Sequence, residues 1–428
     1  MLQNQIAMQS PSPLGLKKSF GFGDRLGLAT PGHLASAKKY RFAPIFAQQS
    51  IREMERTRRT PEDVMNAARA ALADADFTSV WGADADHLKT PQDVDVTAAA
   101  GFCFFTIDPS EFVDNGADAM SENDLAQKLE SMIADGVLQN DWDRHYSDAT
   151  FEIALGLVLR FGREELERAA VKYGRAIAHS AGMARHIASV CTARDGHARG
   201  FEIEVSVDET DTPTSALEHL FFGLELKRRG VRVVSLAPRF IGETEKGIDY
   251  RGDLGAFEKA LDAHVAVARY CGPYKISVHS GSDKFSIYPI VGRVCGELLH
   301  VKTAGTSYLE ALRVLARTDL ALLKSIAEFC HSRFETDRRS YHISTTQSEV
   351  ETLGAQSFGE DAAAWERAYL DERIGRQLLH VTFGSVLTQD NGRTFKAPLL
   401  ERLERDKDLH SQLLQAHFDK HRSLLGAG

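Results

Sequence analysis

The chain has 428 residues, 43% hydrophobic and 26% charged, a composition that excludes disordered and fibrous proteins. Acidic residues outnumber basic ones, and the formal net charge of −9 argues against a surface for nucleic acid or an anionic membrane. The five scattered cysteines form no C-x-x-C pair, and neither a signal peptide nor a run of about 18 apolar residues occurs, so we expect a cytoplasmic protein without a membrane partner.

The predicted elements alternate between short strands and amphipathic helices. Short apolar runs closed by small or polar turns predict eight strands, at 77–87, 101–112, 201–213, 231–240, 274–283, 298–307, 340–346 and 378–386. Helical periodicity follows at 213–229, 254–270, 307–330 and 359–376. Alternation indicates a parallel sheet, and eight strands close a barrel. The sequence therefore predicts an α/β fold, a TIM-type (β/α)8 barrel.

Three segments are expected to lie outside the barrel strands. Residues 110–200 read as a helical insertion between the second and third strands, with helices at 121–136, 150–161 and 164–191. We expect 1–60 to be an N-terminal segment packed on the barrel, 61–395 to be the barrel with its insertion, and 396–428 to be a C-terminal helical extension. The insertion can serve as a lid or as a homo-oligomer interface, and the sequence leaves both open.

Polar side chains alternate with apolar ones along five predicted strands and should point into the barrel. They are Glu204, Ser206, Asp208, Lys275, Ser277, His279, His300, Lys302, His342, Ser344, His380 and Thr382. Burying an ionisable group without a partner destabilises the fold by on the order of several kcal/mol, because the ion loses its interactions with water. These groups are therefore expected to pair with one another, with a metal or with a substrate.

The first two predicted strands add carboxylates at their ends, Asp84, Asp86 and Asp108. Any one of these acids taken alone reads as a helix cap, and any one inward histidine as a hydrogen-bonded core residue. Repetition over several strands favours a site, and mixed imidazole and carboxylate ligands suit Zn, Mn, Ni or Co.

Basic and amide side chains in nearby loops suit an anionic, hydroxylated substrate. Arg239 and Lys246 follow the fourth predicted strand, and Lys284 follows the fifth. Arginine pairs with carboxylates through two hydrogen bonds. The N-terminal segment adds Arg25, His33, Gln48 and Gln49, whose position relative to the barrel the sequence does not give.

Seven runs together resemble one known family. They are GLATPGH, GADADHLKT, DETDTPTSALEH, SLAPRFIGETEKGIDYRGD, GPYKISVHSGSDKFSIYPI, HVKTAGTSYLEALR and LLHVTFGSVL, spread over about residues 20–390. These runs resemble the tagaturonate/fructuronate epimerases of hexuronate catabolism. The resemblance implies a divalent-metal-dependent isomerase that interconverts two keto-uronates, D-tagaturonate and D-fructuronate.

The implied chemistry can be compared with the residues. The inverted carbon lies β to the ketone, so simple exchange of an α-proton does not suffice, and either retro-aldol cleavage with re-addition or transient oxidation is required. No nicotinamide-binding fingerprint is present, which favours the retro-aldol route without that cofactor. This route needs a Lewis acid, an acid/base pair and a cationic clamp.

Roles for individual residues follow from this route. The metal ligands are expected to be Glu209, His279, His300 and His342; the acid/base pair Asp84 and Asp208; the group that assists the enediolate Lys302; and the substrate-binding residues Arg25, Arg239, Asp86 and Lys284. The roles of Asp208 and Glu209 can be exchanged, and His380 can replace His342 as a ligand.

Two rival functions remain at this point. A metal-dependent sugar-acid aldolase would use the same site but release two fragments, whereas an epimerase keeps six carbons together. A sugar-acid binding protein on the same barrel would bind without turnover.

Overall fold

Eight parallel strands close into a barrel in the computed structural model, which describes residues 10–192 and 199–426. The order around the barrel is β1-β10-β9-β8-β7-β4-β3-β2. These strands are β1 (Ser19–Gly23), β2 (Ala43–Ser50), β3 (Gly82–Leu88), β4 (Phe104–Ile107), β7 (Glu202–Ser206), β8 (Ser235–Ala237), β9 (Lys275–Val278) and β10 (Leu299–Thr303). The TIM-type (β/α)8 fold predicted from the sequence is confirmed.

Two of the eight expected strands were wrong, and two others take their place. Residues 341–346 form a loop, and 378–386 lie within helix α14 (Arg373–Thr388). Strands β1 and β2 come instead from the first sixty residues. Residues 375–383 of α14 are buried without a break, and the alternation of Leu379, Val381 and Phe383 with His380 and Thr382 resembles that of a strand.

Strand β1 has the alternation that would have revealed it. Phe20 and Phe22 are buried in the core shared with the surrounding helices, and glycines occupy positions 21 and 23. A Cβ atom at Gly23 would lie 2.6 Å from the carbonyl oxygen of Thr303 on β10. Glycine therefore allows the first and last strands to approach closely enough to close the barrel.

Helices surround the barrel and bury the outward-facing apolar side chains of its strands. The surrounding helices include α1 (Thr30–Ala37), α3 (Pro61–Asp74), α4 (Pro91–Ala100), α7 (Ala216–Arg228), α8 (Leu254–Cys271), α9 (Tyr288–Cys295) and α16 (Lys407–Leu424). Ile203 and Val205 pack in this core, whereas Glu204 between them points into the barrel and contacts other strands. The predicted inward and outward alternation holds for β7.

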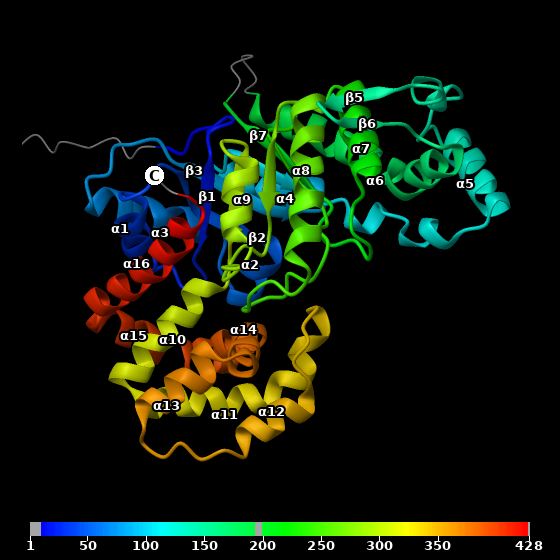
Figure 1. Cartoon of the computed structure of the whole chain (residues 1–428). Coiled ribbons are helices and arrows are strands. Elements are labelled where there is room, and N and C mark those ends of the chain that lie inside the picture. Colours follow the sequence, from blue (N-terminus) through cyan, green and yellow to red (C-terminus); the bar gives the residue numbers. More distant parts are fainter. Residues whose placement is uncertain (1–9, 193–198, 427–428) are drawn as a thin grey trace, which may run out of the picture.

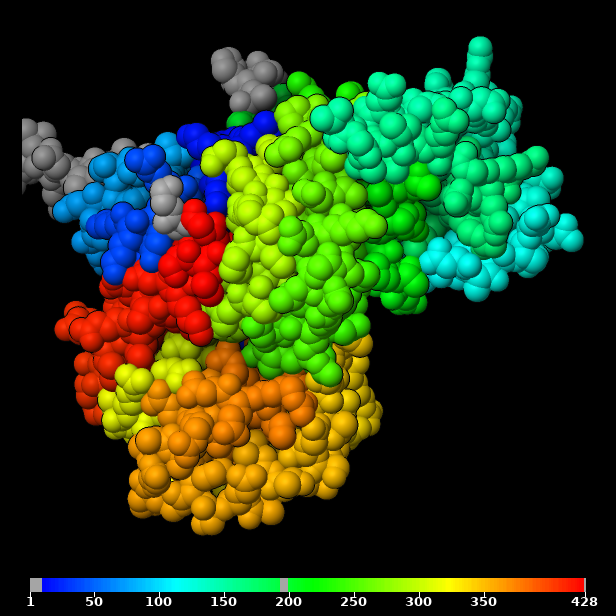
Figure 2. All heavy atoms as spheres, viewed as in Figure 1, coloured from blue at the N-terminus to red at the C-terminus, as the bar shows by residue number. Residues whose placement is uncertain are grey.

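The insertion between β4 and β7 projects from one side of the barrel (Figures 1 and 2). It contains α5 (Glu122–Ala134), the long α6 (Arg163–Cys191) and an antiparallel hairpin of β5 (Phe151–Ala154) and β6 (Leu157–Leu159). The helix expected at 150–161 was therefore wrong. Gly156 has a φ of +81° in the turn of this hairpin, a backbone conformation that glycine adopts without strain.

Residues 306–405 form a group of helices that we call the helical layer. It comprises α10 (Thr306–Thr318), α11 (Leu320–Asp337), α12 (Gln347–Gly354), α13 (Ala362–Glu366), α14 and α15 (Lys396–Arg405). It has a hydrophobic core of its own and covers the end of the barrel at which β2 leads into α2 (Ile51–Thr57) (Figure 1). The C-terminal helical extension expected at 396–428 contains two helices, α15 and α16, which meet at Asp406.

No helix within residues 10–192 and 199–426 combines the length and the apolar character that crossing a membrane requires.

Candidate active site

Two adjoining cavities lie between the C-terminal end of the barrel and the helical layer. The outer cavity has a volume of about 460 Å³ and is lined by residues that include Asp208, Glu209, Arg239 and His342. The inner cavity, of about 30 Å³, reaches the barrel mouth at Asp86, His87, His279 and Lys302. Both are lined by Arg52, Lys246, Ser280 and Tyr341, so the two cavities form one site.

Lys302, on β10, is the centre of the polar network inside the barrel. Its Nζ lies 2.8 Å from Asp84 Oδ2, 2.8 Å from Asp86 Oδ1 and 2.7 Å from Glu204 Oε1. Burial would lower the pKa of Lys302, but these three carboxylates outweigh it and hold that pKa above its usual value. Lys302 is therefore an ammonium ion at neutral pH.

The three carboxylates around Lys302 are not equivalent. Burial, with added repulsion from Asp86 and Glu204, raises the pKa of Asp84 to about 7 against the attraction of Lys302. For Asp86 and Glu204 the balance is reversed, because nearby cationic groups outweigh burial and hold each pKa below its usual range. The negative charge of the network therefore lies on Asp86 and Glu204, and of these two Asp86 lines the inner cavity.

His279 connects this network to the outer cavity. Its Nε2 lies 2.7 Å from Glu204 Oε1, and its Nδ1 lies 3.5 Å from Asp208 Oδ1. Burial and Lys302 would lower the pKa of His279, yet Asp208 and Glu204 raise it to about 9. Asp208 also accepts a short hydrogen bond from Ser206. The carboxylate of Asp208 is thereby fixed at the junction of the two cavities.

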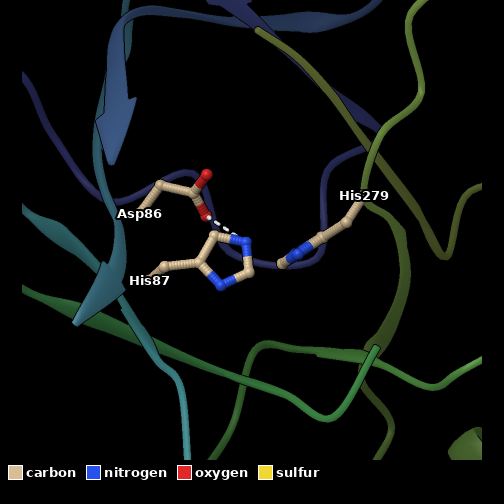
Figure 3. A group of neighbouring side chains, drawn as sticks. All are labelled: Asp86, His87 and His279. Atoms are coloured by element: carbon tan, nitrogen blue, oxygen red, sulfur yellow. Dashed lines mark ion pairs between the residues drawn. The ribbon is translucent and has the colours of Figure 1, made fainter. Parts of the chain in front are cut away.

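His87 faces His279 across the barrel mouth (Figure 3). Its backbone has a φ of +52°, and the register of β3 against β4 shifts between Ala85 and Leu88. This irregularity turns His87 toward the site, where its Nδ1 lies 3.0 Å from Asp108 Oδ2. Although burial opposes it, Asp86 and Asp108 raise the pKa of His87 to about 10.

Asp86, His87 and His279 form a donor set suited to a divalent cation. One potential ligand atom from each side chain lies within 4.8 Å of the others, and all three side chains converge on one space in Figure 3. Mixed carboxylate and imidazole ligands fit Zn, Mn, Co or Ni. Neighbouring carboxylates, Asp86 and Asp108 for His87 and Asp208 and Glu204 for His279, raise the pKa of each ring, and a divalent cation that displaced the ring protons would interact favourably with the same carboxylates. The residues present fit such an ion.

The four metal ligands expected from the sequence do not lie together. Only His279 belongs to the set above, while Glu209 approaches a second group formed with His87 and Asp108. His300 is deep in the barrel, with Nδ1 3.0 Å from Ser19 Oγ. His342 lies on a loop rather than a strand, has a 77% exposed side chain, and contacts Glu243 at 2.8 Å.

The residues expected to bind substrate or to act as acid and base also lie in different places. Arg25 lines the inner cavity and Arg239 the outer one. Lys284 is buried and donates to the carbonyl oxygens of residues 245, 248 and 282. Its side chain does not belong to the described lining of either cavity. Asp84 is fully buried behind Lys302.

The helical layer supplies site residues whose place the sequence did not reveal. Tyr341 lines both cavities, and His380, expected on a barrel strand, reaches the inner cavity from α14. His87 was missed because strand alternation predicts the orientation of its neighbours and fails at a positive φ. Its position in the acidic run GADADH was the available signal.

Comparisons with known proteins identify the family of the chain. Residues 1–425 match the family model UxaE, tagaturonate epimerase. A tagaturonate/fructuronate epimerase from Thermotoga maritima is 42% identical over 416 residues, which cover 97% of this chain and 82% of that protein.

Solved structures of the fructuronate-tagaturonate epimerase UxaE from Cohnella laeviribosi also match. The native structure is 35% identical, has a TM-score of 0.88, and is matched over 98% of this chain and 83% of that one. A complex of the same protein with one glycerol gives the same TM-score and covers 97% of this chain and 83% of that one. The barrel enzyme described here therefore belongs to the UxaE tagaturonate epimerase family.

Proposed function

We propose that this epimerase interconverts D-tagaturonate and D-fructuronate at the cavity between the barrel and the helical layer. The observation that carries the proposal is the convergence of Asp86, His87 and His279 beside a buried, charged Lys302. The two substrates are those for which the relatives are named. The site offers the charge-stabilising groups that inversion at a carbon β to a ketone requires.

The cation-binding part of the proposal rests on the donor set. Asp86, His87 and His279 would hold a divalent metal ion, which when bound supplies a Lewis acid for the ketone and its neighbouring hydroxyl. This set replaces the one expected from the sequence, of which it keeps His279.

The residues of the chain then have distinct tasks in a retro-aldol cleavage and re-addition. A base removes the proton from the hydroxyl on the inverting carbon, the bond to the α-carbon breaks, and the resulting aldehyde rotates before the bond forms again on its other face. Asp208 is the better placed of the two expected acid/base residues, because its carboxylate lines a cavity whereas Asp84 is buried behind Lys302. Lys302 stays protonated, which suits it to stabilise the enediolate but not to remove a proton.

The experiment that tests the reaction follows D-tagaturonate by NMR with chelator-treated protein, with and without added Mn, Co, Ni or Zn. We expect D-fructuronate to appear only with metal. Three-carbon fragments would instead indicate an aldolase, and conversion that is unaffected by chelation would refute the cation site.

Variants test the donor set itself. We expect His87→Ala and His279→Ala to lose more activity than the ~10–100-fold that loss of an outer-shell partner of a metal ligand costs, and to bind less metal after dialysis. His186→Ala is the matched control, because this histidine pairs with Asp95 at 2.7 Å on the exposed side of α6. Full activity and full metal content in both site variants would exclude the assignment.

A further inference from the structure

A third cavity lies beside the helical layer, in addition to the two cavities of the active site. It has a volume of about 450 Å³ and lies where α2 meets α14 and the C-terminal end of α11. Three arginines line it, Arg56, Arg58 and Arg339. None of the three belongs to the described lining of the active-site cavities, and we call this third space the arginine cavity.

Within the part of the chain that the structure describes, none of these arginines is paired with a carboxylate. Arg56 donates to hydroxyl groups, at 2.8 Å in the case of Ser340. Arg58 donates to the amide oxygen of Asn391 at 2.7 Å. The side chain of Arg339 has neither a hydrogen bond nor an ion pair within residues 10–192 and 199–426. Three guanidinium groups therefore converge on one space without a counter-charge of their own.

The acids at the arginine cavity leave it with an excess of positive charge. Asp337 is already paired with Arg333 through Oδ1, at 3.2 Å. Glu55 is the acid of the lining that remains to offset three arginines. The chain as a whole has a formal net charge of −9, which repels anions, so a local excess of guanidinium groups is what an anion requires in order to bind here.

The donors of the arginine cavity and one free acceptor together define a class of ligand. Guanidinium groups form paired hydrogen bonds with phosphate oxygens, and several of them suit a group that carries close to two negative charges. Asp337 Oδ2 is buried and has no partner in the described ranges; a carboxylate oxygen only accepts, so it matches a hydroxyl group. A volume of about 450 Å³ falls in the range of small-molecule sites, roughly 300–1,000 Å³. These features fit a sugar phosphate.

The arginine cavity is connected to the active site through Arg56. The guanidinium group of Arg56 donates to the hydroxyl of Tyr341 and lies 4.9 Å from the centre of its ring. Tyr341 lines both active-site cavities. Ser340, the other partner of Arg56, lines the arginine cavity and the outer active-site cavity. A ligand that binds Arg56 therefore competes with two residues that shape the active site.

From these contacts we propose that the arginine cavity binds the phosphate group of a sugar phosphate, and that the bound ligand weakens substrate binding at the active site. The phosphate takes N–H groups of Arg56 that otherwise hold Tyr341 and Ser340 in place. Coupling between two sites is reciprocal, so the substrate must weaken phosphate binding by the same factor. The binding part of this inference is independent of the reaction, and the coupling part rests on the proposed function.

Binding is tested by calorimetric titration of the whole chain with glucose 6-phosphate, inorganic phosphate and glucose. We expect glucose 6-phosphate to bind more tightly than inorganic phosphate, because only the sugar phosphate can also reach Asp337, and glucose to bind more weakly than either. Arg58→Met and Arg339→Met should each weaken the binding of glucose 6-phosphate about 10-fold, since each removes a charge-assisted hydrogen bond. Tighter binding of inorganic phosphate would overturn the assignment to a sugar phosphate.

Coupling is tested by measuring kcat and KM for D-tagaturonate with and without glucose 6-phosphate. We expect a saturating concentration to raise the wild-type KM about 5-fold or more, the lower end of usual allosteric couplings. The double variant Arg58→Met/Arg339→Met should keep the wild-type KM when no phosphate is added, because neither arginine lines an active-site cavity. It should also lose the response to glucose 6-phosphate.

Controls separate the possible outcomes. Arg163→Met removes an arginine that is 92% exposed and paired with Glu167, and it should bind and respond as the wild type does. Equal binding or an equal rise in KM in the double variant would place the ligand at the active site or on its metal and overturn the inference, as would phosphate binding that leaves the wild-type KM unchanged. Wild-type protein that binds glucose 6-phosphate but does not convert D-tagaturonate would refute the proposed function, whereas normal conversion without saturable phosphate binding would refute this inference only.

Discussion

Two buried lysines in this protein each contact several carboxylates, but they are expected to have different roles. Lys302 contacts three carboxylates inside the barrel. Lys172 lies on α6, in the insertion, and is 1% exposed. It contacts Asp118 of the insertion at 2.9 Å and Glu218 of α7 at 2.7 Å. Removing either ammonium leaves carboxylates that face one another without compensation, so both are needed for stability. Of these two lysines, it is Lys302 that lines the active-site cavity.

Replacing each lysine by methionine separates these roles. We expect Lys302→Met and Lys172→Met each to lower the free energy of unfolding by about 3–5 kcal/mol, the cost of breaking a buried ion pair by removing one partner. Only Lys302→Met should abolish epimerisation. Urea unfolding and NMR assays of the folded fraction measure the two effects, and a fully active Lys302→Met protein would contradict the proposed role.

For individual residues, the sequence predicted the direction in which a side chain points better than the residues that it contacts. Alternation along the strands correctly placed Glu204, His279 and Lys302 inside the barrel, where they contact one another. It could not show that His300, on the same face of β10 as Lys302, lies one layer deeper beside Ser19. Nor could alternation reveal His87, because its positive φ interrupts the regular in-and-out order of the strand.

Among the elements, α7 and α8 are joined by a buried pair of histidines. His219 Nδ1 lies 3.0 Å from His264 Nδ1, and Tyr274 next to β9 contacts His219 Nε2 at 2.8 Å. One ring must donate and the other accept, so the accepting ring must be neutral. Burial accordingly lowers the pKa of His264 from 6.5 to about 4 and holds that of His219 well below its usual value.

This pair should make stability depend on pH in one direction. Above pH 6.5 both the folded and the unfolded protein keep His264 neutral, and its contribution to stability is complete; as the pH falls toward 4, only the unfolded chain gains the proton, so stability decreases. The slope is about 1.4 kcal/mol per pH unit for each such histidine. Urea unfolding between these pH values should show a shallower slope for His264→Gln than for the wild type, and identical slopes would refute the assignment.

The closure of the barrel between β1 and β10 depends on Gly23. An alanine there would place Cβ 2.6 Å from Thr303 O and 2.7 Å from Ala304 Cα, backbone atoms that cannot rotate away. We expect Gly23→Ala to destabilise the fold by about 1–3 kcal/mol, the usual cost of overpacking.

Gly182→Ala provides the matched control for this substitution. Gly182 lies within α6, and the nearest atom to its added Cβ is the flexible end of Arg185 at 3.9 Å. This change should stabilise the helix by about 0.5–1 kcal/mol. Thermal unfolding of the two variants gives the comparison, and equal effects would argue against a tight β1–β10 junction.

The elements also show where prediction from sequence reached its limit. The count of eight strands led to the correct barrel, although two members of that count were a loop and a helix. In LLHVTFGSV the apolar Leu379, Val381 and Phe383 alternate with the polar His380 and Thr382, and because α14 is buried on nearly every side, this segment cannot be told from a strand by its pattern. Strand β1 was overlooked although Phe20 and Phe22 alternate, because the other three of its five positions, Ser19, Gly21 and Gly23, are small.

For the whole molecule, the helical layer and the barrel are two hydrophobic cores that meet at the active site. Arg376 on α14 links them, because it contacts Asp283 Oδ2 at 2.7 Å and donates to the carbonyl oxygen of Gly247 at 2.7 Å. Asp283 and Gly247 belong to loops that follow barrel strands. This contact helps to hold His380 over the barrel mouth.

Loss of this link should release the helical layer first. Trp81 lies in the barrel core and Trp365 in α13, so variants with a single tryptophan report on the two parts separately. We expect Arg376→Met to lower the urea midpoint reported by Trp365 more than that reported by Trp81, with activity following Trp365. Coincident transitions in the Arg376→Met background would show that the two cores unfold together.

The pairing of β1 with β10 has a consequence for synthesis. The first and last strands of the barrel are adjacent in space but about 280 residues apart in the chain. A nascent chain therefore carries an open sheet until residue 303 has left the ribosome, and the free edges of β1 and of the most recent strand are of the kind that pair with other chains. Helix α16, which is made after β10, packs on α1 and contacts Phe20 and Phe22 of β1 through Phe418.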